Sequence, residues 1–215
     1  MIKLPIDPIA CVFDLDGTLL DTERLYTEAA QKILDPFGHT YSIELKRKVM
    51  GGDSIRSARL TIEEFDLPMT PQQFLDERET YLEALFPVAE EIKGAGDFIR
   101  HLTDIGLRQG LATSSHSHLC ELKIGHRGWR EQFAAVVCGD DAELQNSKPA
   151  PDIFLLCAAR MGVDPASTVA FEDSRNGIEA ARAAGMFVIG IESIYTTPED
   201  LVAADLTVPD FYTLI

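Results

Sequence analysis

Short apolar runs alternate with amphipathic stretches along the second half of the chain. Apolar runs typical of buried strands lie at residues 110–113, 134–138, 168–171, 187–191 and, in a shorter form, 206–208. Helical patterns occupy residues 94–105, 117–124, 151–161 and 174–184. This alternation predicts β-α-β units, in which parallel strands form a sheet that is covered by helices.

The first half of the chain has one strand pattern followed only by helical patterns. Residues 9–13 form a continuous apolar run, as expected of a strand that is buried on both faces of a sheet. The helical patterns that follow lie at residues 22–37, 43–49, 54–65 and 72–86, the last with Thr70 as its N-cap. A purely helical block of roughly seventy residues is too long for an ordinary connection in an α/β fold. We therefore predict an inserted all-helical cap over residues 19–87 and a core domain formed by residues 1–18 and 88–215.

Two carboxylates stand one residue apart where the first apolar run ends. Asp14 and Asp16 follow Phe13, and Gly17 lets the backbone turn sharply. Ligands of open parallel sheets gather at the carboxyl ends of the strands, and a strand that ran through both residues would point them the same way. Such a pair can bind a divalent cation, or divide the chemistry between an ionised nucleophile and a proton carrier whose pKa its neighbour raises. A helix cap with a solvated turn is the structural alternative.

The composition excludes several classes of partner. The 215-residue chain has a formal net charge of −16 and a sequence pI near 4.6, so its surface repels nucleic-acid phosphates and anionic membranes. It has no apolar stretch of membrane-spanning length and no signal-peptide pattern at its start, and we expect a cytoplasmic protein. Four cysteines without zinc or disulfide spacing are interpreted as small core residues in a reducing compartment: Cys11, Cys120, Cys138 and Cys157.

Four motifs in a fixed order carry a family resemblance that spans nearly the whole chain. Phe13-Asp14-Leu15-Asp16-Gly17-Thr18 resembles the first motif of the haloacid dehalogenase (HAD) superfamily. The later motifs are matched by Leu111-Ala112-Thr113-Ser114, by Ser147-Lys148-Pro149 with Pro151-Asp152, and by Phe171-Glu172-Asp173-Ser174. Residues 20–26 and 139–141 resemble the branch of pseudouridine-5′-phosphatase-like and β-phosphoglucomutase-like phosphatases. The resemblance implies an α/β fold, with a doubly wound parallel-sheet (Rossmann-like) HAD core and an inserted all-helical cap domain.

The resemblance also implies roles for the residues of the first three motifs. Asp14 would be the nucleophile that forms an aspartyl-phosphate, and Asp16 would protonate the leaving oxygen and then activate water. Thr113 and Ser114 would cradle the phosphate at a helix start, although an ordinary N-cap is the alternative for Thr113. Lys148 would place a point charge on the phosphate and on the nucleophile.

Magnesium is the cofactor that the resemblance implies. Mg²⁺ would be held by hard oxygen donors, namely the Asp14 carboxylate, the backbone carbonyl of Asp16, and Asp173. Glu172 would act through water. Water molecules and the phosphate of the substrate would fill the remaining coordination positions.

Weaker signals lie outside the four motifs. For His116 and His118 a solvated helix start is favoured over metal binding, because no third soft ligand lies nearby. Glu23 follows the first motif closely enough to face the substrate. Gly51 and Gly52 lie where the family places a substrate-specificity loop, and plain helix capping is an equal alternative for them.

The leading hypothesis is a Mg²⁺-dependent phosphatase that hydrolyses a small phosphorylated metabolite. The implied substrates are sugar phosphates and nucleoside 5′-monophosphates such as pseudouridine 5′-phosphate. A sugar phosphomutase is the alternative within enzymes, but that branch uses a cap histidine about a dozen residues past its nucleophile, where this sequence has Tyr26, a poor proton acceptor at neutral pH. A phosphometabolite-binding regulatory protein is the alternative outside enzymes, and the intact motifs argue against it. We expect no nucleic-acid or membrane partner, and a monomer or weak homodimer.

Overall fold

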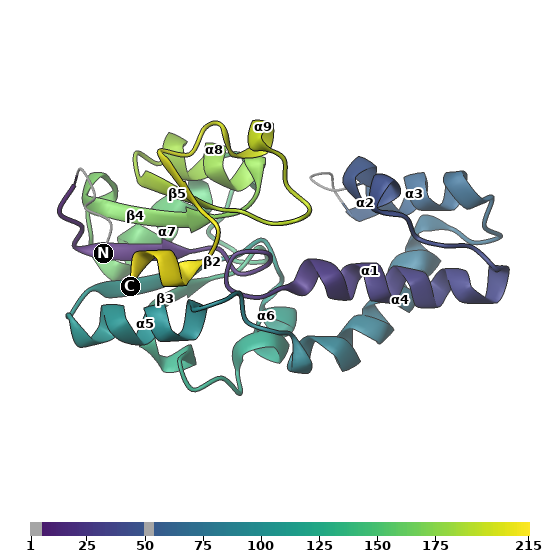
Figure 1. Cartoon of the computed structure of the whole chain (residues 1–215), viewed down its shortest axis with the longest axis horizontal. Coiled ribbons are helices and arrows are strands. Elements are labelled where there is room, and N and C mark those ends of the chain that lie inside the picture. The colour runs from purple at the N-terminus through teal and green to yellow at the C-terminus, as the bar shows by residue number, and fades with distance from the viewer. Residues whose placement is uncertain (1–5, 50–53) are drawn as a thin grey trace. The chain divides into compact units, whose positions relative to one another are not determined.

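The computed structural model of the chain describes residues 6–49 and 54–215 (Figure 1). The chain divides into two compact units. The core unit consists of the residues up to Asp21 together with Glu90–Ile215, and the helical unit consists of Thr22–Ala89. Each unit has its own hydrophobic core.

The core unit is built on a six-stranded parallel sheet with the strand order β3-β2-β1-β4-β5-β6. The strands are β1 (Ala10–Phe13), β2 (Arg108–Ala112), β3 (Phe133–Val137), β4 (Thr168–Glu172), β5 (Phe187–Ile191) and β6 (Leu206–Val208). This order confirms the predicted doubly wound, Rossmann-like α/β core. The direction of winding reverses between β1 and β4, and ligands of such sheets bind beyond the carboxyl ends of the strands at that point.

Helices cover both faces of the sheet. They are α5 (Ala95–Asp104), α6 (Ser117–Ile124), α7 (Asp152–Met161), α8 (Arg175–Ala183) and the single-turn α9 (Pro198–Leu201). The described residues also form five 3₁₀ turns. The core unit contains η3 (Arg130–Gln132), η4 (Pro165–Ser167) and η5 (Phe211–Leu214), and the helical unit contains η1 (Asp35–Phe37) and η2 (Phe86–Val88). Every predicted strand and helix of the core is present within a few residues. The sequence pattern missed α9, because four residues are too few to show a helical period.

The side chains of β1 reach both hydrophobic layers. Val12 packs with Phe154 of α7 and Ile178 of α8 in one layer. Phe13 points to the other face, where its ring stacks on Phe171 with centroids 4.7 Å apart, and other aromatic rings surround the pair. The prediction that this strand is buried on both faces is therefore confirmed.

The helical unit contains four α-helices among the residues that the structure describes. They are α1 (Thr22–Leu34), α2 (Ile43–Val49), α3 (Ser54–Phe65) and α4 (Pro71–Leu85). A core of buried apolar side chains joins α1 to α3 and α4, and includes Ile33, Ala58 and Phe74. The predicted cap at Thr70 is confirmed, since its hydroxyl accepts from the N–H of Gln73 at 3.2 Å and its own N–H donates to the Gln73 side chain at 2.8 Å.

The two chain segments that lead into and out of the helical unit are paired with each other. The Asp21 N–H donates to the Glu90 carbonyl at 2.9 Å, and the Ile92 N–H donates to the Leu19 carbonyl at 2.9 Å. Leu20 forms an antiparallel bridge with Glu91. The core unit thus holds both ends of the inserted block side by side.

Two further expectations can be compared with the structure. All four cysteines are buried and free, which confirms their interpretation as small core residues. Over residues 6–49 and 54–215, no helix has both the length and the apolar character needed to cross a bilayer.

Candidate active site

Three buried carboxylates meet at the carboxyl ends of β1 and β4. Asp14 directly follows β1, Glu172 ends β4, and Asp173 comes next in the chain. Each residue offers one carboxylate oxygen, and these oxygens all lie within 4.8 Å of one another. Three carboxylates so close together repel one another unless cations balance them. Because β1 and β4 are the strands between which the strand order reverses, the cluster lies at the position where such sheets bind ligands.

Lys148 supplies one of the balancing charges. Its Nζ donates to Asp14 Oδ1 at 2.6 Å and to Glu172 Oε1 at 2.6 Å, and also to the carbonyl of Ala112 at 3.1 Å. The side chains of all three charged residues are less than a tenth exposed. Lys148 lies in the loop between β3 and α7, and its peptide bond to Pro149 is cis. The structure thus brings the lysine of the third motif onto the aspartate of the first.

Burial and charge act in opposite directions on these groups. Burial raises the pKa of Asp14 to about 7, although the Lys148 charge lowers it. Burial alone would lower the pKa of Lys148, but the carboxylates of Asp14 and Glu172 raise it above its ordinary value. From the sequence we expected the raised pKa at the proton carrier and an ionised carboxylate at the nucleophile. In the structure it is the pKa of Asp14, the predicted nucleophile, that is raised. A bound cation would favour the ionised form of Asp14.

Glu172 is held by the start of α8. Its Oε2 accepts from the N–H of Asp173 at 3.0 Å, and from the N–H and hydroxyl of Ser174 at 2.9 and 3.0 Å. A Cβ atom at Gly177 would lie 1.7 Å from Glu172 Oε1, so this helix can accept the carboxylate only with glycine there. Glu172 is therefore a fixed partner of Lys148, while its predicted action through water stays a prediction.

Asp173 depends on the turn after Asp16. The Thr18 hydroxyl donates to Asp173 Oδ1 at 3.0 Å. Gly17 has a φ of +86°, and a Cβ atom there would lie 2.1 Å from Asp173 Oδ2. Gly17 thus satisfies two requirements at once, a left-handed backbone and room for the carboxylate.

The three converging carboxylates fit a hard divalent cation. Their oxygens are the donors that Mg²⁺ prefers, and all three residues are buried. The predicted metal set differs from this cluster in one respect, because the cluster contains Glu172 and not the Asp16 carboxylate. We predicted that Asp16 coordinates the metal through its backbone carbonyl, and this stays a prediction.

The Asp16 carboxylate points away from this cluster toward α6. Strand β1 ends at Phe13, so the strand does not run through both aspartates, and the condition for their pointing the same way is not met. Asp16 Oδ2 accepts from the Ser115 hydroxyl at 2.7 Å and from the Thr113 hydroxyl at 3.5 Å. Asp16 Oδ1 accepts from Lys123 Nζ at 2.5 Å. Asp14 and Asp16 thus have separate partners, as a division of roles requires.

The loop after β2 carries Thr113 and Ser114, whose predicted role in cradling phosphate stays a prediction. The strand ends at Ala112, and the buried Thr113 hydroxyl accepts from the Ser115 N–H at 3.1 Å in a local turn. Thr113 is not the N-cap of α6, because His116 occupies that position. The Ser115 N–H is therefore engaged with Thr113, and Ser114, between these two residues, is exposed.

Lys123 is the site residue that the sequence interpretation missed. It is completely buried on α6, in contact with Asp16. A detectable signal exists, because Cys120, Lys123 and Ile124 share the buried face of this helix, and a lysine in such an apolar stripe demands a partner. No motif pointed to it.

The remaining predicted residues are not members of this cluster, or they lie outside the described residues. His116 and His118 are exposed at the start of α6, which agrees with a solvated helix start. Glu23, in the helical unit, forms an ion pair with the buried Lys46. Gly51 and Gly52 lie outside the described residues.

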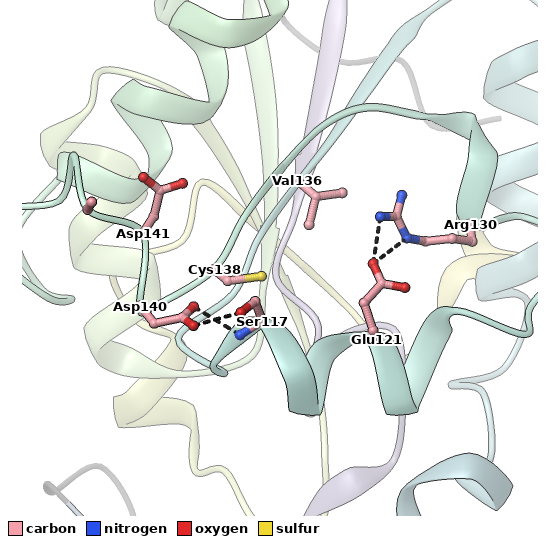
Figure 2. A pocket seen from close by; sticks show the side chains of 8 residues that line it. Ser117, Glu121, Arg130, Val136, Cys138, Asp140 and Asp141 are labelled. Carbon is pink, nitrogen blue, oxygen red and sulfur yellow. Dashed lines mark hydrogen bonds and ion pairs between the residues drawn. The ribbon is translucent and has the colours of Figure 1, made fainter.

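The pocket in Figure 2 shares no residue with this cluster. It measures about 430 Å³ and lies beside α6. Its charged residues are paired along its wall, with Ser117 donating to Asp140 at 2.7 Å and Arg130 to Glu121 at 2.7 Å. We assign it no chemistry.

Comparison with known proteins defines the class. The chain belongs to the haloacid dehalogenase-like hydrolase family, whose model matches residues 11–191. A Drosophila melanogaster protein named "Probable pseudouridine-5'-phosphatase" is 45% identical over 183 residues, covering 83% of this chain and 79% of that protein. The (DL)-glycerol-3-phosphatase 1, mitochondrial, of Arabidopsis thaliana is 39% identical over 206 residues, covering 91% of this chain and 69% of that protein.

A solved structure supports the same assignment. The crystal structure of CbbY from Rhodobacter sphaeroides in complex with phosphate matches with a TM-score of 0.76 and 28% identity, covering 96% of each chain. The chain is thus an enzyme of the HAD family, a hydrolase of phosphoric monoesters.

Proposed function

We propose that this enzyme is a Mg²⁺-dependent phosphatase that acts on a small phosphorylated metabolite through an aspartyl-phosphate. One observation carries the proposal: Asp14 is buried at the sheet's switch point with its carboxylate against Lys148 and beside Glu172 and Asp173. A nucleophilic carboxylate that must approach an anionic phosphate needs such neutralising charge.

The proposed reaction has two steps. An oxygen of Asp14 attacks phosphorus, the bond from phosphorus to the ester oxygen breaks, and Asp16 gives its proton to the departing oxygen. Asp16 then takes a proton from water as that water attacks the aspartyl-phosphate, which releases inorganic phosphate and regenerates Asp14. Lys148 neutralises charge on the nucleophile and on the transferred group throughout.

The Asp14 and Asp173 carboxylates and the Asp16 carbonyl would hold Mg²⁺. The bound ion supplies Lewis-acid stabilisation of charge on the phosphoryl oxygens. Thr18 and Gly17 keep Asp173 in place for this task.

We infer sugar phosphates and nucleoside 5′-monophosphates as the substrate class. Relatives named for pseudouridine 5′-phosphate and for glycerol 3-phosphate support small phosphate esters with a polyol or nucleoside leaving group. In the helical unit Tyr26 packs edge-on against Phe86, and the cations of Lys46 and Arg78 lie 5.6 and 5.5 Å from its ring centroid. A tyrosine in this setting does not provide the proton acceptor of a mutase.

The test is a panel of phosphorylated metabolites incubated with the enzyme and Mg²⁺, followed by parallel assays for inorganic phosphate and for isomeric phosphates. We expect stoichiometric release of inorganic phosphate, and none when EDTA replaces Mg²⁺. Faster accumulation of an isomer than of phosphate would establish a mutase. Binding without any turnover across the panel would favour a regulatory protein.

A further inference from the structure

A buried lysine without a motif of its own contacts the second aspartate of the site. Lys123 is fully buried, and its Nζ donates to Asp16 Oδ1 at 2.5 Å and to the Ser115 hydroxyl at 2.8 Å. The Ser115 hydroxyl in turn donates to Asp16 Oδ2 at 2.7 Å. Three groups from three segments therefore form a closed ring of hydrogen bonds.

The ring holds the Asp16 carboxylate at both oxygens. An aspartate at a glycine turn can otherwise adopt several rotamers, and one hydrogen bond leaves rotation about its Cβ–Cγ bond open. Here an ammonium fixes one oxygen and a hydroxyl fixes the other. The Lys123 side chain is itself buried in the core, and Arg127, just past the end of α6, donates to the Lys123 backbone carbonyl at 2.8 Å.

Stability does not explain why a lysine stands at this place. Moving an ammonium out of water costs several kcal/mol, and an apolar residue of similar volume often serves a core at least as well. Asp16, with about a fifth of its side chain exposed, lies at the solvent-facing end of the pair. The buried ammonium of Lys123 thus reaches from the core to the partly exposed carboxylate of Asp16.

We propose that Lys123 is a positioning residue that holds the Asp16 carboxylate, together with Ser115, in the orientation needed for its proton transfers. This inference rests on the proposed function, because Asp16 is the proton carrier of both steps. Lys123 touches no substrate and acts only through Asp16. Proton transfer by a positioned side chain typically contributes about 10²- to 10⁴-fold, so the loss of position removes a large part of that factor.

The test is a double-mutant cycle on turnover of p-nitrophenyl phosphate with Mg²⁺. The variants are Lys123→Met, Asp16→Asn and the pair of both. We expect Lys123→Met to lower kcat by about 100-fold, and the double variant to match Asp16→Asn alone, because residues that act as a unit are not additive. A purely structural lysine would instead multiply the two losses, and that outcome would overturn the proposal.

Two controls keep the result interpretable. Cys120→Ala shortens a buried side chain one turn earlier on α6, and we expect it to keep kcat within about threefold of wild type, since it touches no reacting group. Melting curves establish that each variant folds. Lys123→Gln keeps a hydrogen-bond donor without the charge and replaces Lys123→Met in the cycle if the latter does not fold.

A crystal structure of the Lys123 variant separates this inference from the proposed function. If the wild type hydrolyses no phosphate ester, the proposed function fails, yet the structure still decides whether Lys123 orients Asp16. We expect the carboxylate to leave the Ser115 hydroxyl when Lys123 is replaced. A carboxylate that stays in place would refute the positioning role.

Discussion

Replacing Gly17 by alanine separates two effects that the structure combines at one residue. Gly17 has a φ of +86°, where alanine costs about 1–2 kcal/mol of backbone strain. Its added methyl group would also lie 2.1 Å from Asp173 Oδ2 and 2.6 Å from Asp173 Cγ. Normal carbon contacts need about 3.5 Å, so the carboxylate must move by more than about 1 Å.

Gly185 provides a matched control for the backbone strain. Its φ is +84°, and a Cβ atom there would meet nothing within 4 Å. Gly185→Ala should therefore cost the same 1–2 kcal/mol and lower Tm by about 2–8 °C in a chain of this size. Gly17→Ala carries this cost as well, and in addition displaces Asp173.

The difference between the variants should appear on adding Mg²⁺. A metal site tolerates ligand displacements of only about 0.2 Å, so Gly17→Ala should lose Mg²⁺ affinity. Binding at a hundredfold excess over Kd stabilises a protein by about 2.7 kcal/mol, or about 5–10 °C here. We expect this rise of Tm in the wild type and in Gly185→Ala, and almost none in Gly17→Ala, when melting curves are recorded with Mg²⁺ and with EDTA. An equal rise in all three proteins would refute the reasoning that Asp173 holds the metal.

Four further predictions concern Asp14, Gly177 and Thr70. Asp14→Asn should abolish turnover without unfolding the protein. In EDTA the free energy of unfolding of the wild type should fall as pH rises from about 4 to about 7. The reason is that the pKa of Asp14 is about 7 in the folded protein and 3.8 ordinarily, so the folded protein keeps this proton to a higher pH than the unfolded chain does. Denaturant titrations over this pH range should show the fall in the wild type and no contribution from this group in Asp14→Asn. Gly177→Ala should displace Glu172 from Lys148 and lower kcat at least about tenfold, with a crystal structure showing the broken contact. Thr70→Ala should remove the cap of α4 and cost about 1 kcal/mol in a denaturant titration.

The sequence predicted those features that have a local cause. Strand β1 is recognisable because both of its faces are apolar, and α4 because Thr70 and Pro71 mark its start. Asp14 and Lys148 are 134 residues apart, and only the resemblance of ordered motifs brought them together before the structure did.

The contacts that the sequence did not predict depend on orientation in space. Whether the Asp16 side chain faces the carboxylate cluster or α6 depends on where β1 ends, and a pattern of residues places such an end only to within a few positions. Lys123 was missed because a single lysine on a short helix resembles a solvated charge until its buried face is known. The sequence could not show that the Thr113 hydroxyl accepts from the Ser115 N–H, because that hydrogen bond depends on the path of the loop after β2.

The paired entry and exit segments make the helical unit removable in principle. Because the Asp21 N–H already meets the Glu90 carbonyl at 2.9 Å, a tight turn could join the chain at these two points and replace everything between them. The parallel sheet uses no strand from the excised part, so the shortened protein keeps every strand pairing of the core. The inserted helical unit could therefore be replaced by a different inserted segment while the core unit and its carboxylate cluster stay unchanged.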